Sequence, residues 1–249
     1  MRKTLASTRR ILAQLHHDPR TIALVLVVPA LLITLLYFVF LDTDAPAGTP
    51  NTFDRVGPVM LAVLPMLLMF IITSVVMLRE RTMGTLERLL TTPISRVNLI
   101  GSYALVFSLL ALGQAVILEI LILVVFGVEI AGAWWALLLI AILDALIGVS
   151  FGLLASAFAT TEFQAVQFMP LFIAPQILLC GLFVAVDSMP SVLAVIARCL
   201  PMTWAVDVVN SVIAESVLDG GDWLRLAGLF LASLAALALA ATTMRRTVD

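Results

Sequence analysis

Charged side chains are scarce in this sequence: only 12% of its 249 residues are Asp, Glu, Lys or Arg, whereas 62% are hydrophobic. Soluble domains are about one quarter charged and about one half apolar. A chain with so few polar groups could not cover its surface in water, so lipid must surround most of its length. The composition therefore excludes an ordinary soluble domain.

Only one of the 14 basic residues is a lysine, Lys3. A P-loop needs a lysine after its glycines to hold nucleotide phosphates, and no glycine-rich turn lies beside Lys3. We therefore expect that this chain is not an ATPase and carries no cofactor of its own. No basic domain is present, so no nucleic-acid partner is expected.

Cysteine and histidine occur only twice each. Cys180 and Cys199 cannot build a disulfide framework. His16 and His17 are neighbours and so face different ways on a helix, with no acidic or thiol cluster nearby. We expect no metal site and no catalytic residues of the Ser-His-Asp kind.

Long apolar runs dominate the rest of the chain, and six of them approach the roughly 20 residues that cross a bilayer. The expected spans are 22–41, 58–78, 101–127, 134–158, 164–186 and 223–244. Before them, residues 1–20 predict an interfacial helix with leucine and isoleucine on one side and basic residues on the other, ended by Asp18-Pro19. The fold class predicted is an all-α membrane protein, a single transmembrane domain over 1–249.

The distribution of basic residues predicts the orientation. With the N-terminus in the cytoplasm, eleven of the 14 basic residues lie inside, and only Arg55, Arg198 and Arg225 lie outside. Both termini are therefore expected in the cytoplasm. The segment 187–222 is too polar to span, and it predicts either two short helices at the outer surface or one that dips back into the bilayer.

The loop between the second and third spans predicts a short amphipathic helix over 84–92. Met83, Leu86, Leu89 and Leu90 recur at helical spacing, and Pro93 marks the point near which the helix stops. Such an apolar stripe needs a cover. It packs on the protein's own helices or on lipid headgroups, or it docks into a groove on a partner.

The run Glu80-x-x-x-Gly84-Thr85-Leu86-Glu87-x-Leu89-Leu90-x-x-Pro93, followed by Gly101, resembles the signature of ABC-2 family permeases. These are membrane subunits of drug, polyketide and nodulation-factor exporters, including the daunorubicin-resistance type. The glutamate lies four residues before the glycine here, whereas the common pattern has three. A second block, from Thr161 to Gln167 with Pro175, Gly181 and Pro201-Met202-Thr203, resembles the family's fifth span and outer region.

The resemblance implies a bacterial plasma-membrane exporter for a hydrophobic or amphiphilic compound. It implies that a separate ABC ATPase subunit binds ATP and Mg, and that a second permease copy or a paralogue completes the pathway within membrane lipid. It also makes 84–92 the coupling helix that inserts into the ATPase. The coupling residues implied are Gly84, Thr85, Leu86, Glu87, Leu89, Leu90 and Pro93.

Two acids, Glu119 and Asp144, lie inside the predicted third and fourth spans at similar depth. Ionisable groups in a membrane are costly and usually face protein or a water-filled path. Either they are helix-packing groups, hydrogen-bonded with Gln114 or Ser150, or they line the transport path and favour cations. The second reading leaves open an ATP-independent secondary transporter or channel.

Three small residues, Gly148, Gly152 and Ser156, form a small-xxx-small ridge in the predicted fourth span. Small side chains let two helix backbones approach closely. The ridge therefore predicts close helix packing, within the subunit or between two subunits.

Overall fold

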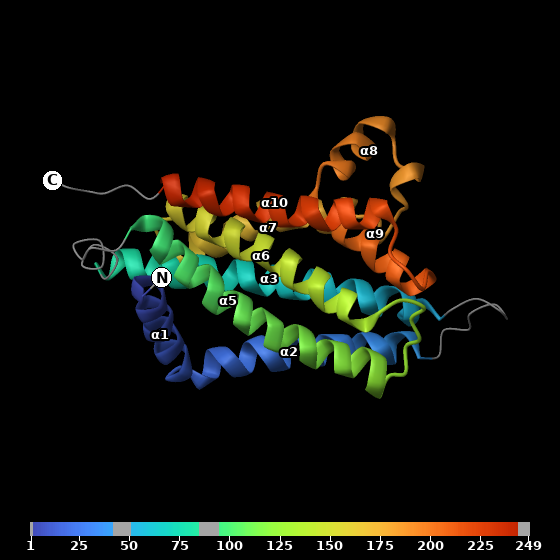
Figure 1. The fold of residues 1–249 in the computed structure, drawn as a ribbon, viewed down its shortest axis with the longest axis horizontal. Coiled ribbons are helices and arrows are strands. Elements are labelled where there is room, and N and C mark those ends of the chain that lie inside the picture. The colour runs from blue at the N-terminus through green and yellow to red at the C-terminus, as the bar shows by residue number, and fades with distance from the viewer. Residues whose placement is uncertain (1, 42–50, 85–94, 244–249) are drawn as a thin grey trace.

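The computed structural model describes residues 2–41, 51–84 and 95–243, and every regular element in these ranges is helical. The all-α fold class is confirmed. The helices are α1 (Arg2–His16), α2 (Pro19–Phe40), α3 (Thr52–Thr82), α5 (Arg96–Glu119), η1 (Ile120–Val125), α6 (Trp134–Phe158), α7 (Glu162–Leu179), η2 (Val186–Ser188), α8 (Ser191–Arg198), α9 (Pro201–Ala214) and α10 (Gly220–Thr243). The longest of them run side by side as a bundle (Figure 1).

Among the described residues, five helices are long and apolar enough to cross a membrane: α2, α3, the continuous helix at 98–125, α6 and α10. A sixth span exists if α8 and α9, which are bent by 84° at their junction, count as one. The predicted fifth span, 164–186, corresponds to α7, with 18 residues, and to the turn that follows it. That turn contains Gly181 at φ +92°, a conformation that L side chains rarely adopt.

The junction between α1 and α2 follows directly from Asp18-Pro19. The Asp18 carboxylate accepts hydrogen bonds from the Thr21 amide at 3.2 Å and the Thr21 hydroxyl at 2.6 Å, which lowers the pKa of Asp18. Pro19 occupies the first turn of α2, where no amide hydrogen is needed. The chain therefore turns sharply, and α1 packs across α5 and α2 (Figure 1).

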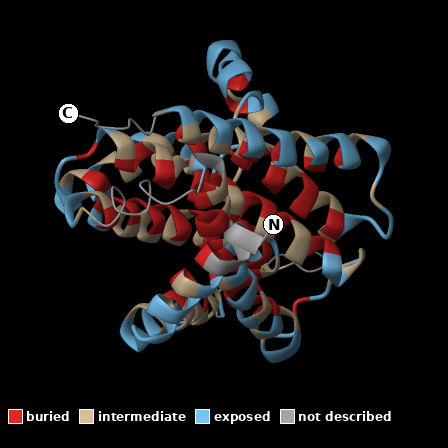
Figure 2. Cartoon of the chain, turned by 60° about the vertical axis from the view of Figure 1, so that its left-hand side comes forward, coloured by how far each residue is buried: buried red, intermediate tan, exposed pale blue. Residues whose placement is uncertain are grey.

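The core lies between α3 and α6, the two most buried helices of the bundle (Figure 2). A Cβ at Gly148 would overlap the Met66 carbonyl oxygen, and one at Gly152 would lie 2.5 Å from the Phe70 carbonyl oxygen. The predicted small-residue ridge thus packs within the subunit, against α3. Only a helix face without side chains lets the two backbones come this close.

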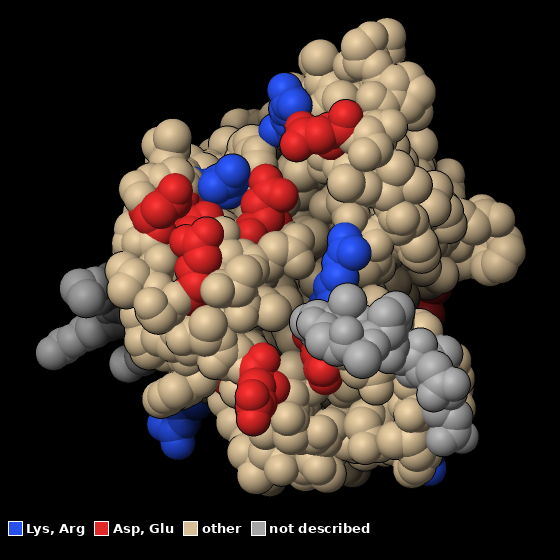
Figure 3. Space-filling view, turned by 90° about the vertical axis from the view of Figure 1, so that its right-hand side faces the viewer, with Lys and Arg blue, Asp and Glu red and all other residues tan. Residues whose placement is uncertain are grey.

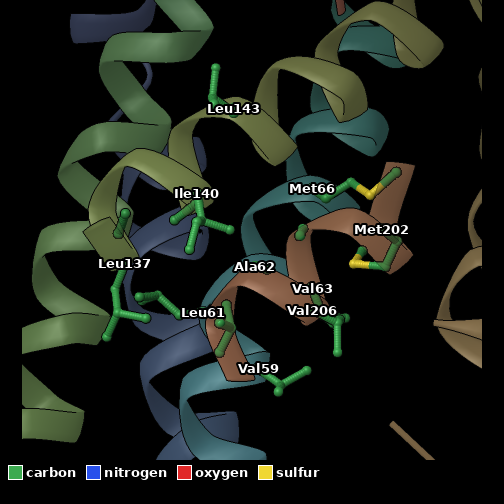
Figure 4. Close-up of a cluster of buried hydrophobic side chains, with 14 of the residues drawn as sticks. Val59, Leu61, Ala62, Val63, Met66, Leu137, Ile140, Leu143, Met202 and Val206 are labelled. Carbon is green, nitrogen blue, oxygen red and sulfur yellow. The ribbon is translucent and has the colours of Figure 1, made fainter. Parts of the chain in front are cut away.

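The two short helices of 187–222 have different surroundings. The helix α9 packs on α3, α6 and α10, and it buries Val209, Met202 and Val206 in the core; Figure 4 shows the last two. By contrast, α8 projects sideways from the bundle, with Val192 and Val195 exposed (Figure 1). The Trp204 indole joins the two helices by donating a hydrogen bond to the Arg198 carbonyl at 2.8 Å.

The two ends of the bundle differ in charge. We call the end that holds α1, the last turn of α3 and the start of α7 the arginine-rich end, and the end where α6 and α10 begin the acidic end. Figure 3 looks onto the acidic end, where acidic groups outnumber the arginines. The described acids there are Asp54, Glu129, Asp187, Asp207, Glu215, Asp219 and Asp222, and the described arginines are Arg55, Arg198 and Arg225.

Candidate functional site

Three consecutive charged residues, Arg79, Glu80 and Arg81, form the last turn of α3. Successive residues of a helix point about 100° apart, so adjacent side chains reach different neighbours. Arg79 forms a bidentate ion pair with Glu162 in the first turn of α7, with N···O distances of 2.7 and 3.0 Å. Arg81 donates a hydrogen bond to the Ser156 carbonyl near the end of α6. The hydrogen bonds from Arg79 lower the pKa of Glu162.

The middle residue, Glu80, is buried, with 8% of its surface exposed. Arg10 of α1 reaches its Oε1 at 3.4 Å and also donates to the Tyr103 hydroxyl of α5 at 3.2 Å. One arginine therefore joins α1, α3 and α5. Since an exposed ion pair gains little and a buried one is costly to break, Glu80 is the energetically critical member of the three.

Together these contacts tie the end of α3 to four helices, namely α1, α5, α6 and α7. We call Arg10, Arg79, Glu80, Arg81 and Glu162 the α3-end cluster. In the sequence, the arginines indicate only the orientation of the chain, and Glu80 is only part of a motif. The run Arg79-Glu80-Arg81 shortly before Gly84 is the sequence pattern that marks this cluster. It does not predict the contacts, because the partners of Glu80 and Arg79 lie 70 and 83 residues away in the sequence.

Gly84 ends the described part of this region. Its φ of +68° is left-handed, and nothing lies within 4 Å of the position that a Cβ would take, so the backbone conformation and not space favours glycine. Its amide donates to the Arg81 carbonyl at 3.1 Å, which closes the last turn. Of the predicted coupling residues only Gly84 is described; Thr85, Leu86, Glu87, Leu89, Leu90 and Pro93 lie outside the described residues.

The two membrane acids lie in buried positions without hydrogen-bond partners among the described residues. Asp144 is fully buried and neither carboxyl oxygen has a partner; Glu119 is 6% exposed and its Oε1 has none. Gln114 is also buried, and both atoms of its amide lack partners in the described chain. Ser150 instead donates to the Leu146 carbonyl at 2.7 Å and contacts the Ser233 carbonyl of α10 at 3.3 Å. No hydrogen bond among the described residues joins these four side chains.

Glu119 also marks a change of helix type. The α-helix α5 ends at this residue and continues as the π-helix η1. Such π segments are rare and often lie at functional positions. Within the described ranges, no group of three or more His, Cys, Asp or Glu residues is placed to hold a metal.

The comparisons with known proteins identify the family. The model of the ABC-2 type transporter family matches residues 2–213, so the chain belongs to this family. It is a multi-pass membrane protein of the ABC-2 permease type.

Three relatives give the level of similarity. The chain is 30% identical over 142 residues to the probable multidrug ABC transporter permease YbhS of Escherichia coli, which covers 57% of this chain and 38% of that protein. It is 30% identical over 135 residues to the probable multidrug ABC transporter permease YbhR of Escherichia coli, covering 54% and 37%. It is 26% identical over 177 residues to ABC transporter G family member 20 of Dictyostelium discoideum, covering 70% and 24%. The matched part of the chain thus spans less than two fifths of each relative.

Proposed function

We propose that this chain is the membrane-spanning permease subunit of an ATP-driven ABC exporter in a bacterial plasma membrane. A separate ATPase subunit binds ATP and Mg, and a second permease copy or a paralogue completes the pathway. The transported compound is hydrophobic or amphiphilic, such as a drug, a lipid or a polyketide. Membership of the ABC-2 family and similarity to proteins named as multidrug permeases support this proposal.

The observation that carries the proposal is the position of the α3-end cluster. It lies directly before 85–94, the segment whose sequence resembles a coupling helix, and it contacts α1, α5, α6 and α7. A displacement of that segment by an ATPase would reach all four helices through short polar contacts. Packed and paired elements move as units because they do not deform continuously.

The proposed orientation in the membrane rests on the charges at the arginine-rich end of the bundle. The described arginines at the arginine-rich end are Arg2, Arg9, Arg10, Arg20, Arg79, Arg81 and Arg96, whereas the described acids there are Asp18, Glu80 and Glu162. Under the positive-inside rule this end is the one expected to face the cytoplasm, and we assign the proposed ATPase contact to it.

The test is to look for a P-loop ATPase in the neighbouring genes, to co-purify it with this chain, and to measure substrate-stimulated ATP hydrolysis. Leu86→Asp should leave the protein inserted but weaken ATPase binding at least about tenfold, because a charge would be buried in an apolar groove. Gly84→Pro should lower binding or uncouple hydrolysis from export, because proline cannot adopt φ +68°.

A matched control carries the same charge at the other end of the bundle. Val217 is 74% exposed at the acidic end, so Val217→Asp should bind the ATPase normally. Normal assembly and export in both Leu86→Asp and Gly84→Pro would remove this loop from the interface. Transport without any ATPase would instead support the ATP-independent alternative.

A further inference from the structure

A pocket of about 160 Å³ opens at the acidic end, between the first turns of α6 and α10 and the segment that follows α9. Its walls include Gly132, Trp135, Glu215, Val217, Leu218 and Trp223. It lies far from the α3-end cluster, at the opposite end of the bundle, and neither the proposed coupling nor the family match assigns it a role. We call it the tryptophan pocket.

Backbone contacts hold the tryptophan pocket in shape. The amides of Ala131 and Gly132 donate to the carbonyls of Ile213 and Val212 at 3.2 and 2.9 Å, so the segment before α6 is fastened to the end of α9. A Cβ at Gly132 would lie 2.9 Å from the carbonyl oxygens of both Val212 and Glu215. Only glycine permits this close approach, and the wall is therefore already built without a ligand.

Two indole rings line the pocket. Trp135 and Trp223 have ring centroids 6.3 Å apart at an interplanar angle of 31°, and the two residues are 43% and 50% exposed. The face of an indole ring carries negative electrostatic potential and attracts cations within about 6 Å of its centroid. Two such faces beside one pocket suit a positively charged organic group.

The charges around the tryptophan pocket also favour a positively charged ligand. No lysine or arginine is among its described lining residues. Glu215 lines it and makes no ion pair with any described residue. The helix α9 ends at Ala214, so the negative end of its dipole also points here.

The N-terminal ends of α6 and α10 carry partial positive charge, which would disfavour a cation, but nearby negative charges outweigh it. In α10, the Asp222 amide donates to Asp219 at 2.7 Å, and Arg225 pairs with Asp222 at 3.2 Å and with Asp207 at 3.3 Å, so three carboxylates and one arginine surround the first turn. The start of α6 has no side-chain cap and contributes about half a positive charge, which the end of α9 offsets with about half a negative charge. The full charge of Glu215 remains.

We propose that the tryptophan pocket binds the ammonium group of an amphiphile, with Trp135 and Trp223 against the cation and Glu215 as its counter-ion. The exposed side chain of Val217, on the rim, gives the apolar tail a surface to follow. The ammonium comes either from a membrane lipid headgroup or from a free cationic amphiphile. Binding there does not depend on ATP-driven transport, so the two proposals fail separately.

The experiment measures binding of dodecyltrimethylammonium to the purified full chain by isothermal titration calorimetry in a neutral detergent. Trp135→Ala and Glu215→Gln should each weaken binding by about three- to tenfold, the range expected for one cation–π or one partly exposed charge contact. Trp135→Phe keeps an aromatic face and should retain most of the affinity. It therefore separates loss of the site from loss of the fold.

Matched controls lie close by in the sequence. Trp134 is 60% exposed and does not line the tryptophan pocket, and Glu129 is an exposed acid outside it. Trp134→Ala and Glu129→Gln should bind like the wild type. Equal binding by all five variants and the wild type would overturn the proposal and leave the tryptophans as membrane-interface anchors only.

A second measurement identifies the source of the ammonium. The wild type and Glu215→Gln are purified from vesicles of equal phosphatidylethanolamine and phosphatidylglycerol, and retained lipid is counted by native mass spectrometry. Selective retention of phosphatidylethanolamine by the wild type alone assigns the pocket to a lipid headgroup. Equal retention of both lipids, with the calorimetric difference intact, assigns it to a free cationic amphiphile. Equal retention without that difference refutes the pocket as an ammonium site.

Discussion

The contact between α3 and α6 gives the sharpest prediction, because it tests a backbone-to-backbone fit. In Gly148→Ala the new methyl group would overlap the Met66 carbonyl oxygen and lie 2.9 Å from the carbonyl carbon. A side chain could rotate away from such a clash, but a helix backbone has to move as a whole. Overpacking of this kind costs about 1–3 kcal/mol, and a backbone obstacle places it near the upper limit.

Helix propensity reduces this cost, because alanine is better than glycine in a helix interior by about 1 kcal/mol. The net loss expected for Gly148→Ala is therefore about 2 kcal/mol, which lowers the melting temperature of a chain of this size by about 4–8 °C. Gly113 of α5 is the control, since nothing lies within 4 Å of its Cβ position. Gly113→Ala keeps only the propensity gain and should raise the melting temperature by about 2–4 °C.

Thermal unfolding in detergent, followed by size-exclusion chromatography of the remaining monodisperse protein, measures both shifts. Gly152→Ala, alone and combined with Gly148→Ala, completes a double-mutant cycle, because its Cβ would meet the Phe70 carbonyl oxygen of the same helix, α3. Once α3 has moved for one methyl group, the second costs less, so the double variant should lose less than the sum. A Gly148→Ala protein that melts at or above the wild-type temperature would refute the predicted clash, as would an equal fall in Gly113→Ala.

The remaining predictions concern charge and topology. In a background with Cys199→Ser, cysteines at Thr85 and Arg245 should resist an impermeant thiol reagent in intact cells while one at Asp219 reacts; labelling at Arg245 would overturn the proposed orientation. Glu80→Gln should cost about 2 kcal/mol of stability because its side chain is 9% exposed, whereas Glu162→Gln, at 52%, should cost under about 1 kcal/mol; equal melting temperatures would contradict this ranking. Asp144→Asn and Glu119→Gln should not lower stability, since a buried carboxyl without a described partner gains nothing from its charge. A selective fall in export of cationic drugs, with neutral drugs spared, would show that these acids line the path.

The helical architecture can be predicted from the sequence because hydrophobicity and length alone decide it. A run such as 134–158 has almost no polar residues to present to solvent, and the structure gives α6 these same bounds. The ridge of Gly148 and Gly152 likewise predicts close packing. Its partner cannot be predicted, because small residues permit an approach to any helix, and only the fold selects α3.

The polar contacts are harder to predict, because they join residues far apart in the chain. Arg10 lies on the basic face of α1, which predicts a position at the lipid headgroups, yet it reaches Glu80 and Tyr103. The matching depth of Glu119 and Asp144 suggests a shared network, but depth fixes only one of three coordinates. The rotation of each helix about its axis decides contact, and for these helices hydropathy is too uniform to specify it.

The place where α6 touches α3 also determines how α3 can move. Met66 lies 14 residues from the start of α3 at Thr52 and 16 residues from its end at Thr82, which are about 21 Å and about 24 Å along the axis. A tilt about this contact therefore moves the two ends in opposite directions by nearly equal amounts, about 2 Å for every 5°. If α3 tilts as a rigid rod about the Gly148 contact, a displacement at Arg79 would reach Phe53 with the same size and the opposite direction.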